Sequence, residues 1–323
     1  MARSSSRGRV RTAVAGTVAA AVMTVALCGA APAAATATVT AAATAARDTG
    51  QPADILNAPT LVARTADGDV GYREVGHGSP LLLITGAGTS MDAWSPAFVD
   101  ALAAHHTVVV FDNAGVGRTS ALPSPLTVSA MADQTSALIS ALRLRHPAVL
   151  GWSLGGMVAQ ALAVRHSGQV GRLVLAATQS GTGAALPIPA AAAAALDSPN
   201  PAVVLSVLFP ADQLAAARAY GLAIIQYPGY YQAPTAVRTA QEAAIQLWMT
   251  GADPAGTRPE RIRVPVLVAD GASDALDPSP NAAILARNLR HARVLLYPDA
   301  GHAFLFQDQA AFTAAIEQFA SRW

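Results

Sequence analysis

The segment Gly151-Trp152-Ser153-Leu154-Gly155 constrains the fold of this chain more than any other feature. It follows the short apolar run 148–150 and precedes residues 154–166, where apolar side chains recur with the spacing of an amphipathic helix. A serine between two glycines at such a junction is typical of a turn so tight that side chains at the glycine positions would collide with the backbone. The turn holds Ser153 clear of the sheet edge, and the N–H groups at the start of the helix point toward it. Ser153 is therefore a candidate nucleophile, and the plainer alternative is an ordinary turn serine.

Two later strands end in residues that can serve such a nucleophile. A nucleophilic serine needs a base, and the base needs an acid that orients it. The strand predicted at 262–270 ends in a loop with Asp274, and the strand predicted at 293–297 runs into a loop with His302. The carboxyl ends of parallel strands lie at one edge of a sheet, which is where ligands bind in open α/β folds. We therefore expect Asp274 to be the acid and His302 to be the base.

A second carboxylate competes for the role of the acid. Asp277 lies three residues beyond Asp274. We favour Asp274 because it is nearer to the strand end, whereas Asp277 is placed to cap a helix that starts near Pro278. The base has no such competitor, because none of the other six histidines follows the last predicted strand.

These segments together resemble the α/β-hydrolase superfamily, and in particular its small esterases, lactonases and cofactor-free haloperoxidase-like perhydrolases. The resemblance covers about residues 60–323, apart from a variable stretch in the middle. Residues 151–156 fit the family's nucleophile elbow, residues 271–274 fit its Gly-x-x-Asp loop, and Gly301-His302 fits its Gly-His loop. The resemblance implies a Ser153–His302–Asp274 triad.

Two segments depart from the family's pattern. Residues 112–120 resemble its Asp-x-Arg-Gly-x-Gly-x-Ser segment, with Ala114 in place of the arginine. Thr85-Gly86-Ala87 stands where many members carry His-Gly-x. We expect the oxyanion hole to consist of the backbone N–H groups of Leu154 and Ala87. Backbone donors do not depend on the side chain, so an alanine at position 87 is compatible with this role.

Apolar runs and helical patterns alternate along most of the chain. Strands are expected at 60–64, 70–74, 81–84, 108–111, 148–150, 173–175, 262–270 and 293–297, with helices at about 92–103, 127–143 and 154–166. This order predicts an α/β fold whose sheet begins antiparallel. The resemblance implies that the fold is of the α/β-hydrolase type, with a mostly parallel twisted sheet flanked by helices. After the sixth strand the alternation stops. Residues 180–255 are rich in alanine and proline, and we expect them to form a helical cap inserted over the active-site edge.

Several aromatic side chains are candidates for a substrate pocket, and ordinary core packing is the alternative for each of them. The strongest candidates are Trp152 beside the proposed nucleophile and the tyrosines of the cap. The full set is Trp152, Phe209, Tyr227, Tyr230, Tyr231, Trp248 and Phe304.

The first residues of the chain have the pattern of an export signal rather than of a fold. Four arginines in residues 1–11 precede a run without charges that extends to Arg47, and small residues follow its apolar core. We interpret residues 1–35 as a cleavable signal peptide, 36–58 as a flexible leader and 59–323 as the α/β-hydrolase domain. The alternative is an uncleaved membrane anchor. The single cysteine, Cys28, is lost if the signal is cleaved, so the mature protein would have no disulfide.

These observations predict a secreted serine hydrolase that cleaves a small or medium carboxylic ester or lactone through an acyl-enzyme. Perhydrolysis, amide cleavage and carbon–carbon bond hydrolysis are alternatives on the same triad. A dinucleotide oxidoreductase, suggested by Gly86-Ala87-Gly88 after a strand, is disfavoured by Met91 at the third glycine position. A hydrolase-fold binding protein without turnover is a further alternative. We expect no cofactor and no metal, no stable membrane association after cleavage of the signal, and, with a net charge of +1, no nucleic-acid partner.

Overall fold

The computed structural model describes residues 54–181 and 184–321 of the chain. The predicted signal peptide, 1–35, and all but the last residues of the predicted leader, 36–58, lie outside the described residues. None of the helices within the described ranges is long and apolar enough to cross a membrane.

A single sheet of eight strands organises the described part of the chain, in the order β1-β2-β4-β3-β5-β6-β7-β8. β1 pairs antiparallel with β2 and β2 pairs antiparallel with β4, whereas all the other neighbours are parallel. This arrangement confirms the predicted fold class. The strands are β1 (Leu61–Thr65), β2 (Gly68–Val75), β3 (Ser79–Ile84), β4 (His106–Phe111), β5 (Ala148–Trp152), β6 (Arg172–Ala176), β7 (Val266–Gly271) and β8 (Ala292–Tyr297).

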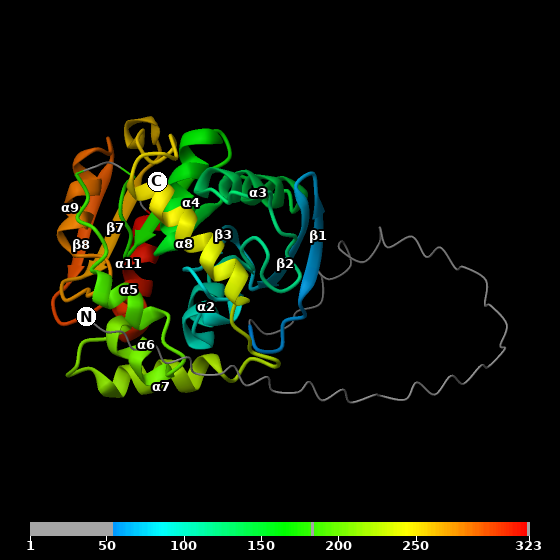
Figure 1. The fold of residues 1–323 in the computed structure, drawn as a ribbon. Coiled ribbons are helices and arrows are strands. Elements are labelled where there is room, and N and C mark those ends of the chain that lie inside the picture. The colour runs from blue at the N-terminus through cyan, green and yellow to red at the C-terminus, as the bar shows by residue number, and fades with distance from the viewer. Residues whose placement is uncertain (1–53, 182–183, 322–323) are drawn as a thin grey trace, which may run out of the picture. The chain divides into compact units, whose positions relative to one another are not determined.

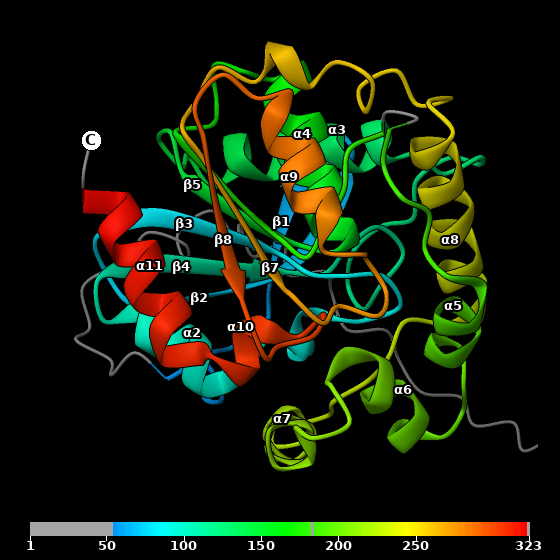
Figure 2. The same cartoon turned by 90° about the vertical axis from the view of Figure 1, so that its left-hand side faces the viewer.

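Helices cover both faces of the sheet, which explains why its central strands are apolar on both sides (Figure 2). One face packs against α2 (Pro96–Ala103), α10 (Phe304–Gln307) and α11 (Gln309–Ser321) in a core rich in aromatic side chains. The other packs against α3 (Val128–Ala141), α4 (Leu154–Arg165) and α9 (Pro280–Arg287) in a second, mainly aliphatic core.

Among the described residues, four α-helices are inserted between β6 and β7, and we call them, with the segments that join them (190–249), the cap (Figure 1). They are α5 (Ala190–Leu196), α6 (Pro201–Leu208), α7 (Leu214–Ile224) and α8 (Thr235–Met249). A proline lies at the start of three of them, at positions 189, 201 and 234, where its missing N–H costs no helical hydrogen bond. Hydrogen bonds fasten the cap to the body, among them Tyr220 Oη to Ala93 O (3.0 Å) and Tyr227 Oη to Trp94 O (2.9 Å).

Proline explains two of the differences between the expected and the observed element boundaries. The helix expected at 92–103 is divided into the 3₁₀ turn η1 (Met91–Ala93) and α2, because Pro96 cannot continue a helix from the residues before it. The strand expected from residue 262 begins at Val266. Pro265 has no N–H to donate to the ladder, and a second 3₁₀ turn, η2 (Pro259–Arg261), precedes it.

Candidate active site

Ser153 lies at the turn between β5 and α4 with φ 56° and ψ −120°, a backbone conformation that L-residues rarely adopt. Strain of this kind costs about 1–3 kcal/mol and persists only where the surroundings hold it. Here the Ser153 N–H donates to Ala176 O (2.9 Å), and the Thr178 hydroxyl donates to Ser153 O (2.8 Å). A Cβ on Gly155 would collide with the carbonyl oxygens of Ile84 and Thr85. The tight turn expected from the sequence is therefore present.

Asp274 and His302 form a buried pair on the loops after β7 and β8. The His302 Nδ1–H donates to Asp274 Oδ2 at 2.7 Å, and the two residues are 4% and 8% exposed, respectively. The other carboxylate oxygen, Oδ1, accepts the N–H groups of Leu276 (2.7 Å) and Asp277 (2.9 Å). Because an ionised carboxylate only accepts, this bond leaves Nε2 of a neutral His302 free to accept a proton.

The competing acid, Asp277, makes a different contact. Its Oδ1 accepts Asn281 Nδ2 at 2.6 Å, and it forms no hydrogen bond with the His302 ring among the described contacts. Of the two carboxylates weighed from the sequence, the structure therefore pairs Asp274 with the histidine.

Two buried carboxyl groups, those of Asp274 and Asp277, act on the charge of His302, and a third, Asp270, interacts with both of them. Burial by itself lowers the pKa of His302, but the charge and hydrogen bond of Asp274, helped by Asp277, outweigh burial and raise it. Burial is also the main reason that the pKa of Asp277 is raised to about 7. Burial and the neighbouring charges of Asp274 and Asp277 hold the pKa of Asp270 far above its ordinary value, so this carboxyl group is protonated at neutral pH. Asp270 was not identified from the sequence, because no motif distinguishes it from other acids at strand ends.

Trp152 holds the loop that carries His302. Its indole Nε1–H donates to His302 O at 3.0 Å, and its ring contacts the imidazole ring with centroids 5.9 Å apart. From the other side, the Ala303 N–H donates to Leu208 O of the cap (2.9 Å). The sequence singled out Trp152 as a pocket residue, but the structure gives it this bond and only 3% exposure.

The two N–H groups expected to form the oxyanion hole lie on adjoining segments. Gly86, next to Ala87, approaches the elbow so closely that a Cβ there would contact the Ser153 Cβ at 3.4 Å. Within the described residues, neither the Ala87 N–H nor the Leu154 N–H donates to a protein acceptor, so both are free for a ligand. The side chain of Asn113 supports the loop by donating to Thr85 O (3.1 Å).

Most of the aromatic side chains proposed for a pocket are buried in the structure. Trp248 is fully buried and donates to Gln179 O (3.2 Å), and Tyr227 is 2% exposed and donates to a backbone carbonyl. Tyr231 donates to Asp112 Oδ2, and Tyr230 is half-buried against the core. Phe209 and Phe304 are also core residues. Tyr227, Tyr231 and Trp248 connect the cap segment to the body through these hydrogen bonds. Phe304 packs within the body, against Tyr297 and Phe312.

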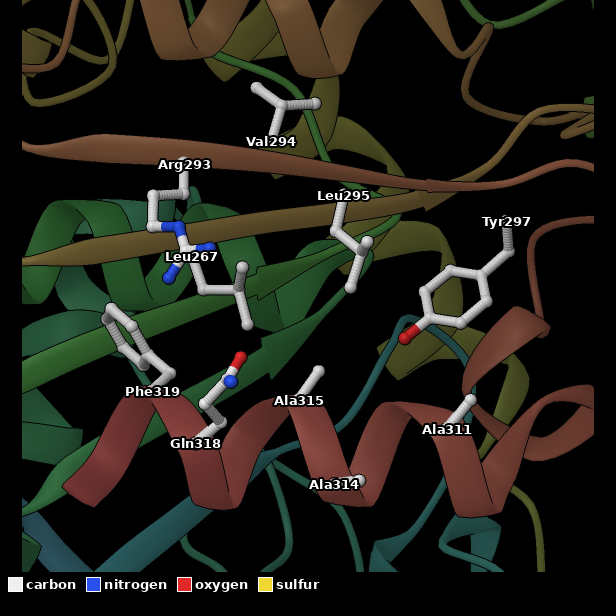
Figure 3. A pocket seen from close by; sticks show the side chains of 10 residues that line it. All are labelled: Leu267, Arg293, Val294, Leu295, Tyr297, Ala311, Ala314, Ala315, Gln318 and Phe319. Atoms are coloured by element: carbon white, nitrogen blue, oxygen red, sulfur yellow. The ribbon is translucent and has the colours of Figure 1, made fainter. Parts of the chain in front are cut away.

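A hollow in the surface lies apart from these residues. It opens between β8 and α11 and is bordered by Leu295, Tyr297, Ala315 and Phe319 among others (Figure 3). None of the residues discussed for the site lines it. Within residues 54–181 and 184–321, no cluster of three His, Cys, Asp or Glu side chains is placed to hold a metal ion.

The chain belongs to the α/β hydrolase fold family, whose sequence profile matches residues 79–309. It is 31% identical over 268 residues to a Caulobacter protein named as the carbamate hydrolase RutD, covering 77% of this chain and 95% of that one. It is also 31% identical over 271 residues to a Mycobacterium tuberculosis protein named as the non-heme bromoperoxidase BpoC, covering 78% and 98%. The solved α/β hydrolase fold protein of Chitinophaga pinensis superposes with a TM-score of 0.73 at 24% identity, covering 84% of this chain and all of that one. The family and these relatives support a hydrolase, in place of the dinucleotide oxidoreductase that was the alternative from the sequence.

Proposed function

We propose that the protein is a secreted serine hydrolase that cleaves small or medium carboxylic esters or lactones. The observation that carries the proposal is the buried 2.7 Å bond between His302 and Asp274, in the same molecule as a strained elbow serine. Ser153 is the nucleophile, His302 the base and Asp274 the acid that orients it. The N–H groups of Ala87 and Leu154 receive the oxyanion.

The proposed reaction needs only these groups and water. The Ser153 Oγ attacks the carbonyl carbon while His302 Nε2 takes its proton, and the tetrahedral oxyanion bonds to the two N–H groups. His302 then gives the proton to the leaving alkoxide, which departs and leaves the acyl group on Ser153. Water attacks this acyl-enzyme with His302 again as base, and the carboxylic acid is released with Ser153 restored.

Other substrates can react on the same groups. A carbamate differs from an ester by a nitrogen on the carbonyl, and a peracid forms when peroxide replaces water. Because two relatives are named as a carbamate hydrolase and a bromoperoxidase, carbamate cleavage and peracid formation should be measured beside ester cleavage. Amide and carbon–carbon bond hydrolysis stay as alternatives, and a binding protein without turnover stays as an alternative class.

The test is a substrate panel combined with one variant. Wild-type protein and Ser153→Ala are compared on acetate to octanoate esters, lactones and an aryl carbamate, and both are treated with a fluorophosphonate probe. We expect turnover and labelling of the wild type and neither in the variant, with unchanged circular dichroism. Labelling of Ser153→Ala at the wild-type rate would remove Ser153 as the nucleophile, and absence of turnover on every class would favour a binding protein.

Export is proposed from residues 1–35 alone. N-terminal sequencing of protein from the culture medium should find a start near Thr36. Recovery of active protein from the membrane fraction with residue 1 or 2 still in place would instead support the membrane-anchor alternative.

A further inference from the structure

Gln241 is a fully buried glutamine on the inner face of the cap helix α8. Its Oε1 accepts the backbone N–H of Gly88 at 2.8 Å, across 153 positions of the chain. Gly88 follows Ala87, whose N–H is one of the two proposed oxyanion donors. The cap therefore contacts the backbone of the catalytic machinery directly.

The orientation of the Gln241 amide is determined by this contact. A backbone N–H can only donate, so the oxygen and not the nitrogen of the amide must face it. The Nε2 group is then buried without a hydrogen-bond partner in the described part of the chain. An unpaired buried donor costs about 1–3 kcal/mol. An apolar side chain would avoid that cost, so the bond to Gly88 is the one interaction that accounts for a glutamine at this position.

The bond matters because the loop around Ala87 is intrinsically soft. Ala87 is flanked by two glycines, Gly86 and Gly88, so rotation of either adjoining peptide plane meets little steric resistance. Each peptide unit is planar, so holding one of its polar atoms fixes the whole unit. The Gly86–Ala87 unit is held within the loop, where the Thr89 hydroxyl donates to Gly86 O (3.1 Å). The Ala87–Gly88 unit is held by Gln241.

Further bonds make the same connection between cap and loop. The Ala233 N–H donates to Gly88 O (3.2 Å), and Thr89 forms an isolated antiparallel bridge with Gln232. The Ser90 hydroxyl donates to Tyr231 O (2.8 Å). Residues 231–233 thus fix the far side of the loop, and Gln241 is the cap side chain that reaches the peptide unit next to the donor.

We propose that Gln241 is a positioning residue. By holding the Ala87–Gly88 peptide unit, it restrains the neighbouring Gly86–Ala87 unit, which carries the Ala87 N–H, so that this N–H keeps facing the oxyanion. The inference rests on the proposed serine hydrolase function. It makes the cap part of transition-state stabilisation and not only a cover over the substrate.

Three variants separate this role from simple packing. Gln241→Met keeps the length of the side chain and removes the acceptor. Gln241→Glu keeps an acceptor for Gly88 and removes the amide donor. Gln246→Met is the matched control, because Gln246 is an exposed glutamine on the same helix. All three are measured for kcat and KM with p-nitrophenyl acetate, for inhibition by an alkyl trifluoromethyl ketone that forms a tetrahedral adduct with serine, and for thermal unfolding.

Deleting an oxyanion donor outright costs about 10²–10³-fold in kcat, so misplacing one should cost about 10-fold or more. We expect Gln241→Met to lose this factor in kcat with KM changed less than about twofold, and to weaken the trifluoromethyl ketone by the same factor as kcat/KM. The kcat of Gln241→Glu should stay within about threefold of the wild-type value, and the kcat of Gln246→Met should equal the wild-type value. If Gln241→Glu does not fold, the comparison of Gln241→Met with Gln246→Met decides alone.

Two results would overturn the proposal. One is wild-type kcat in folded Gln241→Met. The other is a raised KM with unchanged kcat, which would make Gln241 a wall of the binding site. Failure of the underlying function is recognised separately: either the wild type shows no turnover on any substrate class, or Ser153→Ala retains turnover, whatever the Gln241 variants do.

Discussion

Two buried carboxyl groups, those of Asp274 and Asp277, act on His302, and only Asp274 is hydrogen-bonded to its ring. Asp274 accepts its Nδ1–H, while Asp277 acts on His302 through its charge alone. The sequence reduced the choice of acid to Asp274 or Asp277, because both follow the same strand. It could not choose by contact, since the decision depends on how the loop turns: the Asp277 N–H bonds back to Asp274 and directs its own side chain to Asn281.

At the residue scale, the two acids should differ sharply in their effect on turnover. Asp274→Asn should lower kcat about 10³–10⁴-fold, because the amide cannot hold the imidazole in the required tautomer. Asp277→Asn should lower it less than about tenfold, because this side chain makes no bond to His302. Steady-state kinetics on one ester measures both. The reverse ranking would assign the acid to Asp277.

The pH dependence of the reaction follows from the same pair. The base works only as neutral imidazole, so kcat/KM falls as the pH drops through the pKa of His302. Asp274 raises this pKa, so the midpoint of the acid limb should lie above the ordinary value of about 6.5. In Asp274→Asn the charge is gone while burial stays, so any residual activity should have its midpoint at lower pH. A pH–rate profile of both proteins checks the direction, and a shift to higher pH in the variant would contradict it.

At the scale of elements, the sequence predicted the strands within a few residues and missed what joins them. Continuous apolar runs are a strong signal for strands covered on both faces, and all eight expected strands are present. The contacts of Gln241 and Trp152 carry no comparable signal, because they join positions far apart in the chain. The sequence also cannot show which aromatic residues of the cap anchor it and which line a pocket, because composition alone does not distinguish the two roles.

The elbow should tolerate no side chain at its second glycine. A Cβ on Gly155 would collide with backbone oxygens of residues 84 and 85, which cannot move without displacing β3. Gly155→Ala should therefore destabilise the fold by about 1–3 kcal/mol or more and lower kcat, because the displaced segment leads to Ala87. Gly168→Ala is the control, since a Cβ there meets no atom within 4 Å. Chemical denaturation of both variants tests this, and equal stability would show that the turn adapts.

At the scale of the whole molecule, buried carboxyl groups make stability depend on pH in an uncommon direction. Burial raises the pKa of Asp92, Asp112 and Asp270, and only Asp92 has a bonded cation, Arg73 (2.5 Å). Such a group holds its proton in the folded state and releases it in the unfolded state above pH about 4. The folded protein therefore binds more protons, and the contribution of these groups to stability falls as the pH rises.

Asp270 offers the clearest test, because its Oδ2 is buried without a hydrogen-bond partner in the described residues. Asp270→Asn removes the titration and keeps the shape, so it should stabilise the protein at pH 8 and have little effect at about pH 2, where the aspartate is protonated in both states. A gain of 1 kcal/mol raises Tm by about 2–4 °C in a protein of this size. Asp133→Asn is the opposite control: hydrogen bonds to Arg165 and His166 outweigh burial and lower the pKa of Asp133, so its small contribution is present above its unfolded pKa and lost in acid. Calorimetry of the wild type and both variants between about pH 2 and 8 measures these slopes. A loss of stability in Asp270→Asn that is constant across this range would mean that the carboxyl group acts through its hydrogen bonds and not through its titration.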